Sequence, residues 1–109
     1  MANTVAIDRL FDAFADQTRR AILHELRAGP LPVGDLSQRL PISRPAVSQH
    51  LRILTDAGIL HVTPAGNRRI YGFAPDGIAP LRAYLDEMWD DALTGFARAA
   101  QAQSTKDTP

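Results

Sequence analysis

One segment, Ser43 to Gly58 (SRPAVSQHLRILTDAG), constrains the fold more than any other, because both ends of a helix can be read from it. Ser43 is a typical N-cap, Pro45 suits the first turn of a helix, and Gly58 is a typical terminator. On a helical wheel, one side carries three apolar residues, Val47, Leu51 and Leu54. The opposite side is densely polar, which a helix that only packs does not require.

Apolar residues at helical spacing predict three helices before this segment. They are a first helix through Ile7, Leu10, Phe11 and Phe14, a second (DQTRRAILHELRAG) capped by Asp16 and ended by Gly29-Pro30, and a short third from about Val33 to Leu40. After Gly58, ILHVTP and RRIYGFAP alternate apolar and polar residues around the turn AGN, which predicts a β-hairpin. A last helix is expected to begin at Asp76 or Gly77.

This order predicts a mainly α fold with a two-stranded β-wing, ααααββα. The short turn PISR joins the third and fourth helices as in a helix-turn-helix, and the hairpin that follows makes it a winged helix-turn-helix. A chain of 109 residues suits one domain. We therefore expect a single winged-helix domain over residues 1–100, with terminal helices that form a dimer interface, and a flexible tail over 101–109 (QAQSTKDTP).

Composition narrows the function classes. The chain has no cysteine, which excludes disulfides and thiolate metal sites. No signal peptide and no apolar stretch of about 20 residues is apparent, so we expect a soluble cytoplasmic protein that does not contact a membrane. No phosphate-binding glycine loop, nucleophile elbow or paired histidines on one helix are present. We expect neither enzymatic activity nor a cofactor.

The formal net charge is zero, but the charges are unevenly distributed. Between Arg39 and Arg69 there are five arginines and a single acid, Asp56, a net charge of +4. Between Asp76 and Arg98 there are five acids and two arginines, a net charge of −3. A basic middle and an acidic end indicate two surfaces with different partners.

The polar side of the fourth helix and the hairpin turn carry groups that suit double-stranded DNA. Glutamine and arginine pair with base edges in the major groove, and exposed N–H groups at a helix N-terminus bind phosphate. A wing meets the backbone or the minor groove. The predicted DNA-binding residues are Ser43, Arg44, Pro45, Ser48, Gln49, His50 and Arg52 on the helix and Asn67, Arg68 and Arg69 on the wing. The alternative for the helix is that its polar side has no binding role and is simply exposed to solvent.

Residues 68 and 69 raise a separate question, because neighbouring strand residues point to opposite faces. We expect only one of Arg68 and Arg69 to reach DNA strongly. The other is expected to form an ion pair, with an acid of the last helix as the suggested partner.

The segments FADQTRRAILHEL, PVGDLSQRL, SRPAVSQHLRILTDAGIL and GNRRIYGF resemble the ArsR-type winged-helix transcriptional repressors in order and spacing. The resemblance runs from about Leu10 to Phe73 and extends loosely into the last helix. It implies a homodimer joined through its first and last helices, with Ser48, Gln49 and His50 on DNA. It also implies that binding to an operator blocks transcription, often of the repressor's own operon.

Many members of that family sense metals, and here the chain departs from them. Where a cysteine motif would begin the third helix, this chain has LPVGDL, with Pro32 and Gly34 at the thiolate positions. Where other members pair Asp with His on the last helix, this helix has carboxylates and no histidine. Carboxylates alone bind transition metals weakly. We predict no metal site and place the chain in the branch without the metal-site residues.

The last helix carries a longer apolar stripe than a small domain needs. Two recognition helices held about 34 Å apart would read successive major grooves. The predicted dimer interface comprises Leu10, Phe11 and Phe14 with Leu81, Leu85, Met88, Trp89, Ala92 and Phe96. Some of these residues are also candidates for the monomer core.

We therefore expect a homodimeric, sequence-specific regulator, a repressor on an inverted-repeat operator. The sequence leaves two alternatives open. One is a winged-helix module that binds another protein. The other is a repressor released by a small-molecule effector at the dimer interface, whose chemistry the sequence does not define.

Overall fold

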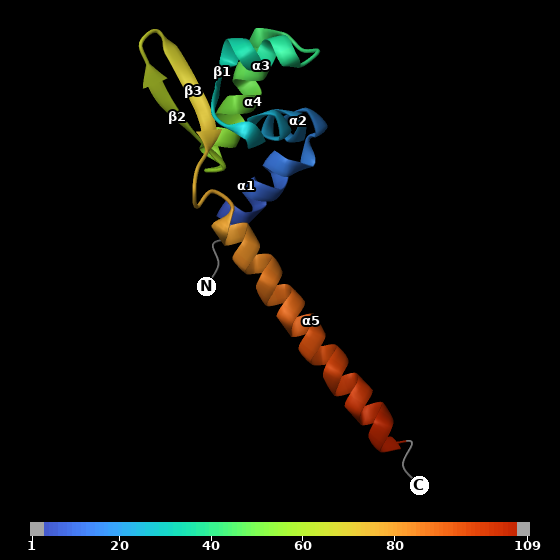
Figure 1. Ribbon diagram of the computed structural model, residues 1–109. Helices are drawn as coiled ribbons and strands as arrows, with labels where there is room; N and C mark the ends of the chain where they lie inside the picture. The colour runs from blue at the N-terminus through green and yellow to red at the C-terminus, as the bar shows by residue number, and fades with distance from the viewer. Residues whose placement is uncertain (1–3, 107–109) are drawn as a thin grey trace.

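The computed structural model describes residues 4–106, with side chains as far as residue 104. In order, its elements are α1 (Thr4–Ala15), α2 (Gln17–Glu25), a 3-10 turn (Leu26–Ala28), β1 (Leu31–Pro32), α3 (Val33–Arg39), α4 (Arg44–Asp56), β2 (Leu60–Ala65), β3 (Arg68–Phe73) and α5 (Ala79–Lys106). Figure 1 shows a body of α1–α4 and the sheet, from which α5 projects. The predicted winged helix-turn-helix is confirmed, with one additional strand.

Both predicted helix caps are present. The Asp16 carboxylate accepts a hydrogen bond of 2.9 Å from the backbone N–H of Arg19 at the start of α2. The Ser43 hydroxyl oxygen accepts a hydrogen bond of 3.3 Å from the N–H of Ala46 at the start of α4. Each cap satisfies a donor that the first turn of a helix leaves unpaired. These residues therefore set where α2 and α4 begin.

The core lies where α4 packs against α2 and α3, and residues of α1 complete it. The three apolar residues of α4, Val47, Leu51 and Leu54, are completely buried. The remaining fully buried large side chains are Leu10, Ile22, Leu26, Leu36 and Ile59. Because the apolar side of α4 is buried in this core, its opposite side faces outward.

The sheet has three antiparallel strands in the order β1-β3-β2 rather than the two strands predicted. β1 pairs Leu31 with Tyr71 and Pro32 with Ile70. A strand of two residues, one of them proline, has no alternation by which the sequence could reveal it. The wing itself matches the prediction: Ala65 pairs with Arg68 around a two-residue turn, and Gly66 has a φ of 64°, which glycine adopts readily.

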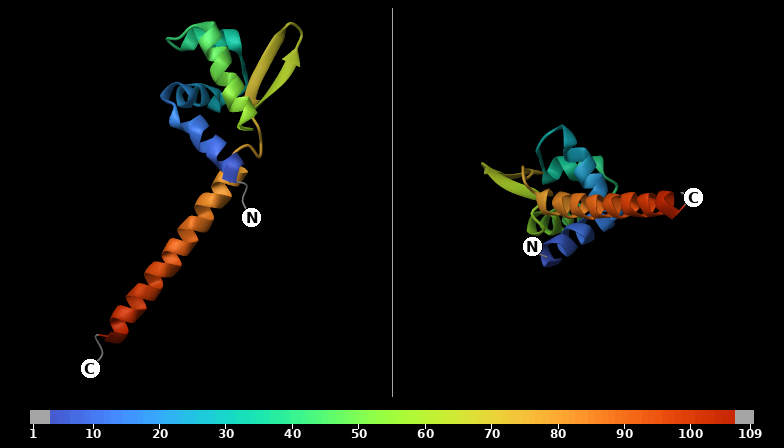
Figure 2. Two further views of the ribbon diagram at one scale, coloured as in Figure 1. Left: turned by 180° about the vertical axis from the view of Figure 1, so that it is seen from behind. Right: turned by 90° about the horizontal axis from the view of Figure 1, so that it is seen from below.

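The last helix begins later and ends later than predicted. Residues 75–78 form turns, so α5 starts at Ala79 rather than at Asp76 or Gly77. It continues to Lys106, so the segment predicted as a flexible tail is helical over 101–106, and 107–109 lie outside the described residues. The molecule therefore measures 76 × 29 × 23 Å, with α5 along the long axis in both views of Figure 2.

The base of α5 is fixed by close backbone packing at Gly77. A Cβ atom at this position would lie 2.6 Å from the carbonyl oxygen of Gly58 and 2.8 Å from that of Ile59. The N–H of Ala74 also donates a 2.9 Å hydrogen bond to the carbonyl of Ile59. The turn that leads into α5 is thus held against the end of α4 and the start of β2.

Candidate nucleic-acid interface

The polar side of α4 is exposed, as the helical wheel predicts. Arg44, Pro45, Ser48, Gln49 and Arg52 are all exposed. They lie on consecutive turns opposite the buried apolar residues of α4. The N-cap residue is also exposed and leaves the first turn open at the protein surface. This face presents guanidinium, amide and hydroxyl groups without an acid until Asp56 at its far end.

A cleft of about 840 Å³ separates α4 from the wing. The predicted DNA-binding residues that line it are Arg44, Ser48 and Arg52 from α4 and Asn67, Arg68 and Arg69 from the wing. The N-terminal end of α3 closes one side through Val33 and Gly34, and a Cβ atom on Gly34 would lie 4.0 Å from an Arg44 guanidinium nitrogen. Four arginines face one concave surface that has a single carboxylate, Asp56, in its lining.

The two wing arginines differ from the prediction in two respects. Both line the cleft, although neighbouring strand residues were expected to separate, because their long side chains start at the narrow tip of the hairpin. Arg68 forms the predicted ion pair, but its partner is Asp35 on α3, at 3.7 Å, and not an acid of the last helix. Both side chains of this ion pair are exposed, so the pair contributes little to fixing the wing against α3.

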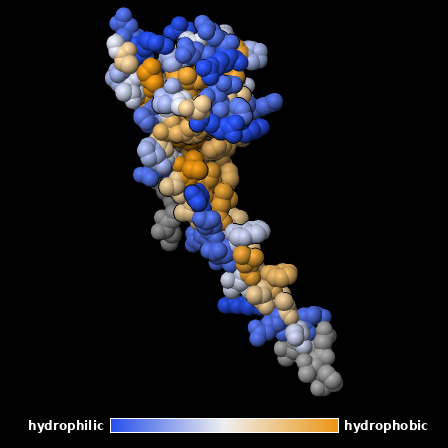
Figure 3. All heavy atoms as spheres, viewed as in Figure 1, coloured by the Kyte–Doolittle hydropathy of each residue, from blue (hydrophilic) through white to orange (hydrophobic). Residues whose placement is uncertain are grey.

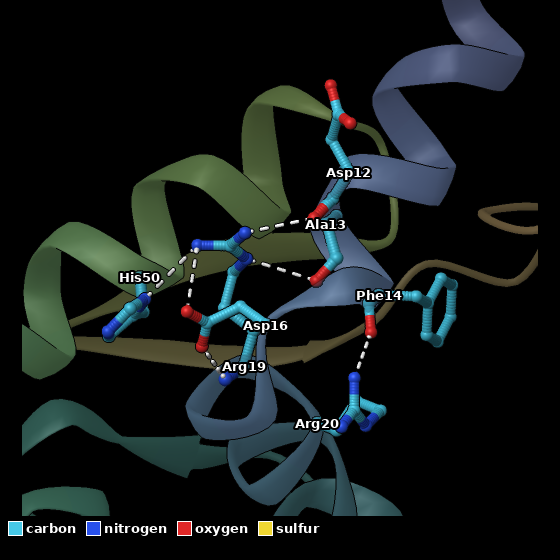
Figure 4. Close-up of polar contacts among 7 residues, drawn as sticks. All are labelled: Asp12, Ala13, Phe14, Asp16, Arg19, Arg20 and His50. Carbon is cyan, nitrogen blue, oxygen red and sulfur yellow. Dashed lines mark hydrogen bonds and ion pairs between the residues drawn. The ribbon is translucent and has the colours of Figure 1, made fainter.

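His50 lies at the border of the α4 face, half-buried, and its Nδ1 is 3.4 Å from Arg19 Nη1 (Figure 4). Arg19 also donates hydrogen bonds to two carbonyl oxygens at the end of α1, those of Asp12 at 2.9 Å and Ala13 at 3.0 Å. One guanidinium therefore links the end of α1, the start of α2 and the middle of α4. The sequence does not single out Arg19, because nothing local distinguishes it from the neighbouring Arg20.

Asp16 completes this group of side chains. Its carboxylate accepts the backbone N–H of Arg19 and lies 4.0 Å from the Arg19 guanidinium. The hydrogen bond from the Arg19 N–H, assisted by the nearby positive charge, lowers the pKa of the Asp16 carboxyl below its ordinary value. The charged cap therefore helps to position Arg19, which connects the α1–α2 corner to His50 on α4.

The predicted dimer residues fall into two groups. Leu10 is 2% exposed and belongs to the monomer core, so its place in the predicted interface is wrong: α1 turns this side chain toward the core. Phe14 and Leu81 are partly buried against the same core. Phe11 is exposed and meets Tyr84 of α5 edge to face, with ring centroids 6.1 Å apart.

The rest of the predicted interface lies on α5 and is exposed. Leu85, Met88, Trp89 and Phe96 have exposed fractions of 46%, 51%, 65% and 73%, and Ala92 lies between them. Leu93, which the sequence analysis did not include, is exposed beside them. Figure 3 shows apolar residues gathered where α5 leaves the body and recurring along the helix. A stripe of this size on a free helix surface is typical of a protein–protein contact.

Among the described residues, no three His, Cys, Asp or Glu side chains are grouped as they would be to hold a metal ion. Within the same part of the chain, no helix is long and apolar enough to cross a membrane.

The geometry defines a class: winged helix-turn-helix proteins that present the second helix of the motif beside a basic wing. A helix-turn-helix domain family model matches residues 14–63. The chain is 51% identical over 96 residues to the HTH-type transcriptional regulator Rv2034 of Mycobacterium tuberculosis, covering 88% of this chain and 90% of the relative. It is 35% identical over 82 residues to the arsenical resistance operon repressor of Escherichia coli, covering 74% and 70%.

Solved structures agree. An ArsR-like transcriptional regulator from Rhodococcus sp. RHA1 superimposes with a TM-score of 0.73 at 27% identity, covering 88% of this chain and 93% of that one. The chain belongs to the ArsR family of HTH-type transcriptional regulators. It is therefore a DNA-binding regulator of transcription.

Proposed function

We propose that this protein is a cytoplasmic, homodimeric repressor that binds an inverted-repeat operator through α4 and the wing. The observation that carries the proposal is the cleft between these two elements, where four arginines, the Asn67 amide and the Ser48 hydroxyl line a surface that has one carboxylate. A cationic concave surface beside an exposed helix suits a DNA backbone and an adjacent major groove.

The position of each residue on α4 determines whether it contacts a base or a phosphate. Gln49 and Arg52 project from the middle of the exposed face, where an amide can pair with adenine and a guanidinium with guanine. Ser48 reaches a base or a phosphate, and the Pro45 ring suits a thymine methyl group. The open N-terminal turn at Ser43 and Arg44 contacts phosphate. His50 contacts DNA from the border of the face and is held there by Arg19.

The wing supplies contacts that do not depend on sequence. Asn67, Arg68 and Arg69 contact the backbone or the minor groove from the far wall of the cleft. Arg68 shares its charge with Asp35, whereas Arg69 has no carboxylate partner among the described residues. We infer that Arg69 is the stronger phosphate ligand of the two.

A second copy places two α4 helices on one duplex. The exposed α5 stripe, extended by Phe11, is the surface proposed to join the two copies. Two protomers related by a two-fold axis require a two-fold symmetric site. Specific affinity then comes from two half-sites, each of which would bind weakly alone.

Fluorescence anisotropy with the DNA upstream of the protein's own gene tests the proposal. The logarithm of the binding constant is expected to fall linearly with the logarithm of salt concentration, with a slope of about −0.9 per phosphate contacted. Specific binding should exceed binding to random duplex by at least about a thousandfold. A flat salt response together with tight binding to another protein would favour the alternative, a winged-helix module for protein contact.

We also propose that binding needs no metal. Stoichiometric zinc is expected to leave the anisotropy of the protein–DNA complex unchanged, with a chelator as the matched control. Release of DNA by zinc would reverse this part of the proposal and return the chain to the metal-sensing branch.

A further inference from the structure

A second hollow, of about 420 Å³, lies between α2, the end of α1 and the turn that leads into α5. Its floor is apolar and recessed: Leu23 and Ile59 line it with only 6% and 0% of their surface exposed. Phe73 and Ile78 stand at its rim with 42% and 44% exposed. The volume falls within the range of small-molecule sites, which are mostly apolar with a few polar groups.

The hydrophilic residues at the rim of this hollow are cationic, and they line it mainly with the carbon atoms of their side chains. Arg20, Arg27 and His24 line it, and no acid does. Arg20 Nη1 donates a 2.6 Å hydrogen bond to the carbonyl oxygen of Phe14, and Arg27 Nη2 lies 3.3 Å from His24 Nε2. Neither arginine has a carboxylate partner among the described residues, where the ion-paired arginines are Arg19, Arg39 and Arg68.

We propose that this hollow binds a carboxylate with a slender apolar body, of the medium-chain fatty acid class. The apolar chain lies on Leu23, Phe73 and Ile78, and the carboxylate accepts hydrogen bonds from the guanidinium groups of Arg20 and Arg27 at the rim. A cation is disfavoured by both arginines. An α5 helix from a second copy also carries carboxylates beside its apolar stripe, so occupation of the hollow by that helix is the other outcome of the test.

Occupancy of the hollow acts on the base of α5. Phe73, Ala74 and Ile78 line it, and the N–H of Ala74 donates to the carbonyl of Ile59 at its floor. The same turn holds Gly77 against the backbone of Gly58 and Ile59. A ligand wedged here changes how α5 leaves the body and therefore the spacing of two α4 helices in a dimer. This regulatory step rests on the proposed function, whereas the binding site does not.

The binding test uses the full chain and sodium decanoate below its micelle-forming concentration. In ¹H–¹⁵N spectra, decanoate is expected to shift the amide signals of Leu23, Phe73 and Ile78 in a saturable manner. Decanol, which has the same chain without the charge, should bind about tenfold more weakly. Equal binding of the two compounds, or no shift with decanoate, would overturn the site. Shifts of these amides on raising the protein concentration alone, with none from decanoate, would assign the hollow to a second copy and would also overturn it.

Arg27→Gln is the variant of choice, because among the described residues the polar contact of Arg27 is with the exposed side chain of His24. It should abolish the preference for decanoate over decanol, while Arg9→Gln on α1, a matched exposed arginine outside the hollow, should leave it intact. Retention of the preference in Arg27→Gln and also in Arg20→Gln would refute the assignment of the carboxylate to these side chains.

The regulatory step is tested by operator anisotropy with and without decanoate. Saturating decanoate should weaken operator binding by about tenfold in the parent protein and not in Arg27→Gln. Failure of the unliganded protein to prefer any duplex would count against the proposed function and leave the site standing. Normal operator binding that decanoate leaves unchanged, despite saturation of the amide shifts, would refute the regulatory step alone.

Discussion

The body of the molecule buries its large apolar side chains, whereas α5 leaves most of its large apolar side chains exposed. In the body, α4 places Val47, Leu51 and Leu54 out of contact with water. In α5, Leu85, Met88, Trp89 and Leu93 leave about half or more of their surface exposed, and Phe96 is 73% exposed. The body therefore buries its central apolar residues within the chain, whereas among the described residues α5 packs mainly through its base, where it meets α1 (Figure 1).

The difference indicates that stability and assembly are located in separate regions. Burying a large apolar side chain is worth about 1.5–3 kcal/mol, and α5 forgoes most of that gain in a single copy. A helix that keeps an apolar stripe without a partner in its own chain is explained by a partner outside it. On this account, α4 and the wing depend on the body for their shape and on α5 for their pairing.

Leu85→Glu tests the role of α5 in assembly and should have the strongest effect on DNA binding. It places a charge in the middle of the exposed α5 stripe, so the protein is expected to sediment as a monomer and to lose about 4 kcal/mol of operator affinity, roughly a thousandfold. Sedimentation equilibrium and anisotropy measure the two effects on the same sample. Thr94→Glu, on the opposite side of α5, is the control and should change neither. A Leu85→Glu protein that stays dimeric would remove α5 from the interface.

Leu51→Ala should damage the body instead. It leaves a cavity where the side chain is completely buried, and we expect a loss of about 3 kcal/mol in the free energy of unfolding. Leu93→Ala, on the exposed stripe, should cost less than about 0.5 kcal/mol when both are compared by urea denaturation in the monomeric Leu85→Glu background. Similar losses for the two variants would mean that α5 packs on its own body in solution.

Gln49→Ala on the exposed face of α4 and Arg69→Ala on the wing separate base contacts from backbone contacts. Gln49→Ala should weaken specific binding by about 1–3 kcal/mol and relax the preference at one base pair, because it removes a base contact. Arg69→Ala should weaken binding to all sequences alike and reduce the salt slope by about one, with a smaller effect for Arg68→Ala, which removes a charge already shared with Asp35. Gln17→Ala on α2 is the control. Parental operator binding by both variants would show that the assigned surface is wrong.

The smallest expected effect concerns Asp16. Because its pKa is lowered in the folded protein, the charged carboxyl adds stability above its ordinary value of 3.8, and this contribution is lost as pH falls through the lowered pKa. Asp16→Asn keeps a capping oxygen but does not titrate, so the acid limb of stability against pH should become less steep in thermal melts below pH 4. An unchanged acid limb would mean that the carboxylate contributes nothing through its charge.

The sequence predicted the elements that local chemistry specifies. Ser43 and Asp16 predicted the starts of their helices because a cap interacts only with the first turn that follows it. Gly66 predicted the hairpin turn because few residues other than glycine adopt its positive φ. β1 was not predicted because it has only two residues and forms by pairing with β3, which is distant in the sequence. The later start of α5 was missed because Gly77 is fixed by the distant backbone of Gly58 rather than by its neighbours.

The candidate site shows the same division. The outward direction of Ser48, Gln49 and Arg52 follows from helical periodicity alone, and the structure places them outward. The partner of Arg68, the link from Arg19 to His50 and the burial of Leu10 depend on how elements pack together. Those features required the structure.

Hydroxyl-radical footprinting on the protein's own upstream DNA is the decisive measurement, since it reports where two copies of α4 lie on one duplex. The account predicts two protected patches related by a two-fold axis, with centres about 34 Å apart along the DNA. A single patch, or protection that random competitor DNA removes as readily as the specific sequence, would contradict it.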